Sequence, residues 1–231
     1  MRLFYGSQDV VCCREMPKGL LEIMKPLLSI IDEPFHKVFP RILEYHVSPG
    51  ATILDPTCGQ KRSWETYFRH VEENEYNFIK HPEYDIHFSD QKDGVKLQTL
   101  STKAHAVYFD PPYIWGVSDS QADREEDYGG YSHSLSDLKK LMSEANQVFN
   151  NLLLPAGKLL FKYCDVFSME DRKFYFGPLL WLPLFSNFEV VDSYSVIHHH
   201  VGGTAYQVKN RPCSIGNFSY ITILQKKSEH K

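Results

Sequence analysis

Residues 104–113 read AHAVYFDPPY, an apolar run followed by an acid, two prolines and an aromatic ring. The run at 104–109 predicts a buried strand, and parallel strands of an α/β sheet present ligand-binding residues beyond their carboxyl ends. Proline has a fixed φ angle and no N–H group, so the two prolines would hold the backbone after this strand rigidly. The pattern places four candidate catalytic residues at one sheet edge: Asp110, Pro111, Pro112 and Tyr113.

This edge suits the binding of an amino group. Both hydrogens of an amino group need acceptors, and Asp110 together with a main-chain carbonyl, that of Pro111, can supply them. Holding the hydrogens aims the nitrogen lone pair at an incoming electrophile, which is catalysis by orientation. The ring of Tyr113 can stack on the face of a base. A plain turn with prolines requires neither a strand before it nor an aromatic after it, so a functional interpretation is favoured.

Two further strands are predicted to end in acids. The segment 53–59, ILDPTCG, closes a short strand at 51–55 with Asp55 and has a glycine in the following turn. Such a glycine lets backbone N–H groups approach a ligand, and the acid can accept hydrogen bonds from a ribose or an ammonium group. The strand at 84–89 is followed by Asp90, whose carboxylate could bind ribose hydroxyls. Each of these signals also fits an ordinary turn.

The rest of the chain alternates between helices and strands. Residues 16–31 have helix-like apolar spacing interrupted by a proline, and a second helix is predicted to begin at Pro40. The other predicted helices lie at 63–73, 134–153 and in part of 168–186, and the other strands at 158–163, 188–196 and 218–224. This order predicts an α/β sheet flanked by helices and closed by an antiparallel hairpin.

Composition narrows the class of protein. A length of 231 residues with 42% hydrophobic and 14% aromatic residues fits one sizeable folded domain and argues against disorder. No apolar run is long enough to span a bilayer, and no apolar segment follows the first residues as in a signal peptide, so no membrane partner is expected. The five cysteines match no zinc or disulfide pattern, which favours free thiols in a reducing cytoplasm.

Neither the net charge nor the polar segments of the chain identify the binding partner. The net charge of −4 argues against a protein that simply coats nucleic acid, so any such contact must be local or aided by a homodimer partner or a specificity partner. The polar stretch 115–132 is either a substrate-facing lid or a solvated acidic loop. Residues 198–200 are three consecutive histidines, but on an extended segment they alternate in direction, so no metal site is expected.

Together, residues 53–59 and 110–113 resemble the class I S-adenosylmethionine-dependent amino-methyltransferases, most of all the DNA N6-adenine/N4-cytosine methylase-like group. Weaker likeness at 153–162, at 217–224 and at Phe39-Pro40 extends the resemblance over roughly 36–225. It implies a Rossmann-like seven-stranded methyltransferase domain at 36–231, with an N-terminal helical extension at 1–35. The residues that it implies for S-adenosylmethionine are Phe39, Asp55, Thr57, Cys58, Gly59 and Asp90.

The resemblance also implies a substrate: an exocyclic amino group of a nucleic-acid base, with DNA favoured over RNA. Two alternatives stay open. The chain lacks an evident domain for reading a DNA sequence, so the base could be adenine N6 or guanine N2 of RNA. The family often has a glycine where this chain has Lys61, so the protein could instead be a catalytically silent binding subunit.

Overall fold

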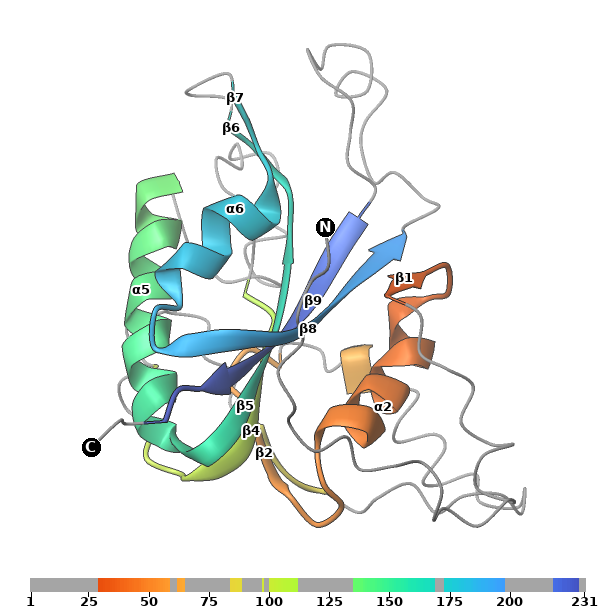
Figure 1. Cartoon of the computed structure of the whole chain (residues 1–231), viewed down its shortest axis with the longest axis vertical. Coiled ribbons are helices and arrows are strands. Elements are labelled where there is room, and N and C mark those ends of the chain that lie inside the picture. Colours follow the sequence, from red (N-terminus) through yellow and green to blue (C-terminus); the bar gives the residue numbers. More distant parts are fainter. Residues whose placement is uncertain are drawn as a thin grey trace, which may run out of the picture.

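The computed structural model describes residues 29–58, 62–64, 84–88, 97, 100–111, 135–168, 173–197 and 218–228. A seven-stranded sheet in the order β1-β8-β9-β5-β4-β2-β3 forms its centre (Figure 1). The strands are β1 (Ile30–Ile31), β2 (Thr52–Asp55), β3 (Asp85–Phe88), β4 (Ala104–Phe109), β5 (Leu153–Cys164), β8 (Phe188–Ile197) and β9 (Phe218–Lys226). Helix α2 (Phe35–His46) packs on one face, and α5 (Leu135–Leu152) on the other.

Most of the sheet is parallel, and one strand runs against the others. Strands β3, β2, β4 and β5 pair in parallel, whereas β9 is antiparallel to both of its neighbours, β5 and β8. The predicted α/β sheet of seven strands with a closing antiparallel pair is therefore confirmed. Alternation of polar and apolar residues at 193–196 in β8, and the apolar run 106–109 of β4, explain why these strands could be predicted from the sequence.

Strand β1 comes from a segment that was expected to be helical. Ile30 and Ile31 pair in parallel with Ser195 and Val196 of β8, so the helix prediction for 16–31 is wrong at these two residues. The side chain of Ile31 is buried, and β-branched residues suit a pleated surface better than a helix. The remaining part of that segment, up to residue 28, lies outside the described residues.

Helix α2 begins earlier than predicted. It starts at Phe35, directly after Pro34, and Pro40 lies inside it rather than at its first position. An interior proline removes a backbone hydrogen bond and costs about 3 kcal/mol. Burial outweighs this cost, because four apolar side chains are completely buried on the sheet side and each contributes about 1.5–3 kcal/mol. These four are Val38, Phe39, Ile42 and Leu43.

Helix α5 matches its prediction at 134–153 within one residue at each end, but the strand after it begins sooner than expected. Leu153 already pairs with Ala104, and Lys158 is the next residue in register, with Ala106. The intervening residues form an irregularity in which Ala156 has a φ of 59°. The proline and glycine signal at 155–157 thus marks a bulge inside β5, not the break between helix and strand.

The segment 168–186 is helical only in part. It contains α6 (Gly177–Trp181) and a 3-10 turn at Leu182–Leu184, as well as half of a small two-stranded sheet that was not predicted, β6 (Val166–Ser168) with β7 (Lys173–Tyr175). The helix expected at 63–73 begins as a 3-10 turn at Arg62–Trp64, and its remainder lies outside the described residues. Within the described ranges, no helix has the length and apolarity needed to cross a membrane.

Candidate active site

The sheet reverses its direction of winding between β2 and β4. From β2 the chain passes to β3 on one side and then returns to β4 on the other, and β2 lies parallel to both. In open α/β sheets, ligands bind outside the carboxyl ends of the strands at this kind of switch point. Asp55 is the last residue of β2, and Asp110 directly follows β4. The topology therefore brings two of the predicted site residues to the expected ligand-binding edge.

Thr57 ties these two strand ends together. Its backbone N–H donates to Asp55 Oδ1 over 3.0 Å, and its Oγ1 accepts the backbone N–H of Asp110 at 2.9 Å. One residue thus fixes the turn after β2 and the start of the segment after β4. The carboxylates are held close enough for Asp110 to act electrostatically on Asp55.

Asp55 is almost completely enclosed. Its residue is 1% exposed, and its Oδ2 accepts the indole N–H of Trp64 at 2.7 Å. Burial raises the pKa of Asp55 to about 7, against the opposing effects of the hydrogen bonds from Trp64 and Thr57, and the charge of Asp110 raises it further. Asp55 therefore holds the loop after β2 from inside, and its predicted contact with the cofactor stays a prediction.

The raised pKa of Asp55 predicts a pH-dependent stability. The folded state binds this proton more tightly than the unfolded chain, so the contribution is complete below the ordinary value of 3.8 and is lost as the pH rises through about 7. In that window the free energy of unfolding should fall by up to about 1.4 kcal/mol per pH unit. Urea unfolding of the wild type and of Asp55→Asn across the window measures this, and the variant should lack the fall.

The effect of Asp55 is obtained by subtracting the free energy of unfolding of Asp55→Asn from that of the wild type at each pH. This subtraction is needed because the titration of His46 changes the stability in the opposite sense. Burial lowers the pKa of His46, so its contribution is present above the ordinary value of 6.5 and is lost as the pH falls. Both proteins contain His46, and subtraction removes its effect. Parallel stability curves for the wild type and Asp55→Asn would show that Asp55 does not titrate in this way.

Asp110 is partly buried at this edge, among hydrogen-bond donors. Its Oδ2 is 2.6 Å from Lys162 Nζ and accepts the hydroxyl of Tyr108 at 3.2 Å. The Tyr108 oxygen is in turn 2.9 Å from Ser63 Oγ, which donates because the Tyr108 proton points to Asp110. Burial and the nearby carboxylates raise the pKa of Tyr108 well above its ordinary value, so this hydroxyl remains a donor.

Aromatic rings pack against the side chains that bond Asp55 and Asp110. Phe39 is completely buried, with its ring centre 4.5 Å from that of Tyr108 and 4.9 Å from that of Trp64. The structure therefore places this predicted cofactor residue behind the two side chains that bond Asp110 and Asp55. A role of Phe39 in cofactor binding stays a prediction, and in this arrangement it would be exerted through Trp64 and Tyr108.

The remaining predicted residues divide into two groups. Pro111 is buried directly after Asp110, and Cys58 is half-buried after Thr57. Those that lie outside the described residues are Gly59, Asp90, Pro112 and Tyr113, together with the loop 115–132 and the histidines 198–200. Among the described residues, no group of three or more His, Cys, Asp or Glu could hold a metal ion.

Four polar partners of the site were not predicted from the sequence: Ser63, Trp64, Tyr108 and Lys162. Only one of them has a recognisable signal in the sequence. Lys162 is a charged residue in the otherwise apolar run 159–163, and a lysine that is mostly shielded from water in a central strand requires a partner. The others became visible only when the fold brought residues far apart in sequence together.

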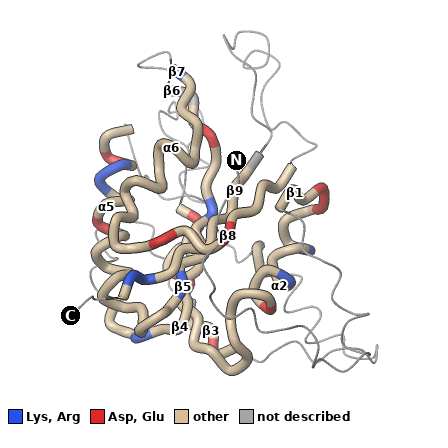
Figure 2. The backbone as a smooth tube through the Cα atoms, in the orientation of Figure 1, with Lys and Arg blue, Asp and Glu red and all other residues tan. Residues whose placement is uncertain are grey.

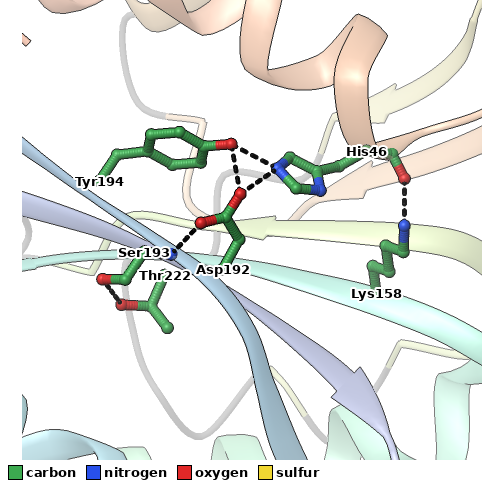
Figure 3. Close-up of polar contacts among 6 residues, drawn as sticks. All are labelled: His46, Lys158, Asp192, Ser193, Tyr194 and Thr222. Carbon is green, nitrogen blue, oxygen red and sulfur yellow. Dashed lines mark hydrogen bonds and ion pairs between the residues drawn. The ribbon is translucent and has the colours of Figure 1, made fainter. Parts of the chain in front are cut away.

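A second polar cluster lies on the same face of the sheet, under the end of α2 (Figure 3). Tyr194 donates to Asp192 Oδ2 over 2.6 Å, and His46 Nε2 lies 2.7 Å from the Tyr194 hydroxyl and 3.3 Å from the same carboxylate oxygen. Lys158 Nζ donates to the main-chain oxygen of His46 at 2.7 Å. These contacts fasten α2 to β8 and β5, and none of them involves Asp55 or Asp110.

Comparison with known proteins gives likenesses of structure only. No known family profile matches the chain, and no curated protein matches it in sequence. TrmN from Thermus thermophilus matches with a TM-score of 0.42 and 12% identity, over 83% of this chain and 48% of TrmN. The chain thus spans about half the length of that protein.

Two further neighbours are described as N-methyltransferases. The 1,6-didemethyltoxoflavin-N1-methyltransferase of Burkholderia thailandensis, with bound 1,6-didemethyltoxoflavin and S-adenosylhomocysteine, matches with a TM-score of 0.45 and 12% identity, over 85% of this chain and 80% of that one. N-methyltransferase NodS from Bradyrhizobium japonicum WM9 gives 0.41 and 10%, over 84% and 94%. Identities this low and TM-scores this small assign neither an activity nor a substrate to the chain.

Proposed function

We propose that this protein transfers a methyl group from S-adenosylmethionine to an exocyclic amino group of a nucleic-acid base, N6 of adenine or N4 of cytosine in DNA. The observation that supports it is the position of Asp110. This carboxylate lies immediately beyond β4 at the switch point, and it is held by Tyr108 and Lys162 while Thr57 holds its backbone. A fixed acceptor at a ligand-binding edge is what an amino substrate needs.

The residues beside Asp110 fit S-adenosylmethionine in their chemistry. That molecule carries a sulfonium, an ammonium and two ribose hydroxyls, so it suits an edge with carboxylate and hydroxyl oxygens. Beside Asp110, the described edge offers Thr57 and the half-buried turn at Cys58, and the predicted residues Gly59 and Asp90 would complete the site. When bound, S-adenosylmethionine supplies an electrophilic methyl group on a positively charged sulfur.

The chain's own part in the reaction is orientation and charge. Asp110 would accept one hydrogen of the amino group, and the main-chain carbonyl of Pro111 the other, which directs the lone pair toward the methyl group. As the N–C bond forms and the bond between sulfur and the methyl group breaks, the nitrogen gains positive charge, which the Asp110 carboxylate would stabilise. The surplus proton would then leave the nitrogen through this carboxylate to solvent. In a duplex, the base must leave the stack at a cost of about a few kcal/mol.

Contact with the nucleic acid would be local. Figure 2 shows the Lys and Arg positions of the described residues spread along α2, α5 and the strands among acidic ones, with no continuous basic stripe in this view. Together with the net charge of −4, this favours a small contact around the extruded base over a long contact along the backbone. A homodimer or a specificity partner would supply the rest of the binding surface.

Transfer of labelled methyl groups to total DNA and to total RNA tests the proposal. DNA should become labelled, and mass spectrometry of its nucleosides should find N6-methyladenine or N4-methylcytosine. Label in RNA alone would reject the DNA assignment and retain the chemistry. Calorimetric binding of S-adenosylmethionine without any transfer would support a silent binding subunit, and absence of both binding and transfer would reject the proposal.

A further inference from the structure

We infer that Lys162 is a positioning residue, which fixes the orientation of Asp110 for methyl transfer. This inference rests on the proposed function. Lys162 Nζ lies 2.6 Å from Asp110 Oδ2, and the two side chains are only 18% and 22% exposed. Ion pairs between exposed groups contribute little, but a pair shielded from water interacts more strongly. The contact therefore holds the carboxylate in place.

The position of Lys162 is itself fixed by the fold. It lies in β5, whose residue Phe161 is in register with Phe109 of β4, so Lys162 is level with Asp110 across the sheet. On the side of α2, the ring centre of Phe35 lies 4.7 Å from Nζ, at a distance that suits a cation–π contact. The ammonium is held between the sheet and the first residue of the helix, and movement toward solvent would break both contacts.

This arrangement fixes the plane of the Asp110 carboxylate. Both Lys162 and Tyr108 contact the same oxygen, Oδ2, and Thr57 accepts the backbone N–H. Because a carboxylate is planar, anchoring Oδ2 and the backbone also sets the direction of Oδ1. An amino substrate would then meet an acceptor whose orientation needs no adjustment at the moment of reaction.

Lys158 provides a matched control on the same strand and the same face. It lies four residues before Lys162, which is two repeats of the strand. Its ammonium donates to the main-chain oxygen of His46 and not to Asp110 (Figure 3). Replacement by methionine removes one charge at either position and retains a similar side-chain length. Any difference between Lys162→Met and Lys158→Met therefore reports on the contact with Asp110.

Two measurements test the inference. In crystal structures of the ligand-free protein, the Asp110 carboxylate should keep one orientation, with Oδ2 toward Tyr108, in the wild type and in Lys158→Met, and should lose it in Lys162→Met. In the methyl-transfer assay, kcat of Lys162→Met should fall on the order of 10–100-fold. Its Kd for S-adenosylmethionine should stay within about twofold of the wild type, because a positioning effect acts on the transfer step.

An unchanged orientation of Asp110 in Lys162→Met, or a turnover equal to that of Lys158→Met, would overturn the inference. Lys162→Gln and Lys162→Arg serve if the methionine variant does not fold. Glutamine should reproduce the effects of methionine, and arginine should retain most of the wild-type turnover because the positive charge is preserved. If the orientation changes but the wild type transfers no methyl group to any substrate, then the positioning of Asp110 by Lys162 stands and the proposed function fails.

Discussion

Replacement of Asp110 by alanine is expected to lower the rate of methyl transfer by a factor on the order of 10³. The variant loses the acceptor for one amino hydrogen and the negative charge beside the nitrogen, and Lys162 loses its partner at 2.6 Å. Because Thr57 bonds the backbone of Asp110 and not its side chain, the backbone at this residue should stay in place. Initial rates with labelled S-adenosylmethionine measure the effect.

Controls separate catalysis from folding. Asp85→Ala removes an exposed acid at the start of β3, at the opposite end of the sheet from the site, and should leave the rate unchanged. Asp110→Asn retains one acceptor oxygen without the charge and should fall between alanine and the wild type. Calorimetry should show S-adenosylmethionine binding in all three variants. A rate of Asp110→Ala close to that of Asp85→Ala would exclude Asp110 from the reaction.

Replacement of Trp64 by alanine should destabilise the protein by about 3–5 kcal/mol, which is a large share of the stability of a domain. The indole is completely buried against Phe39 and Tyr108, and its N–H is the donor to Asp55 Oδ2. The variant therefore combines a cavity with the loss of a buried hydrogen bond. Urea unfolding at fixed pH measures the change.

The control here is Trp64→Phe, which fills much of the cavity and removes only the indole N–H. Its cost should be about 1–3 kcal/mol, the price of leaving a buried acceptor without its donor. A loss of less than about 1 kcal/mol in Trp64→Ala would contradict the described packing, since surface substitutions have effects of that size. Comparison of the two variants separates the packing of the ring from its hydrogen bond with Asp55.

Local patterns in the sequence were sufficient for most of the sheet. The apolar run of β4 and the spacing of α5 reflect burial on the two faces, and both elements lie where they were predicted. Rules for single residues were less reliable when packing opposed them. Pro40 lies inside α2 because burial of one face of that helix outweighs the lost hydrogen bond. Ile30 and Ile31 pair with β8, although the apolar spacing at 16–31 is typical of a helix.

For a related reason, only part of the site could be predicted from the sequence. Asp55 and Asp110 carry signals because acids and prolines at strand ends are local features of the sequence. The partners that set their properties are not local: Lys162 lies 52 residues from Asp110, and Ser63 lies 45 from Tyr108. Such pairs depend on strand order and register, which no short motif encodes. The burial of Asp55 was equally hidden: the sequence predicts an acid that contacts a ligand, and the structure encloses this acid behind Trp64.

The place of β9 in the sheet has a consequence for how the chain folds during synthesis. β9 follows β5 and β8 in the chain, yet it lies between them and joins them. Until it leaves the ribosome, both neighbours present unpaired edges, and such edges invite pairing with other chains. A chain that stops before residue 218 should therefore aggregate, whereas the half of the sheet made of β3, β2, β4 and β5 could already assemble.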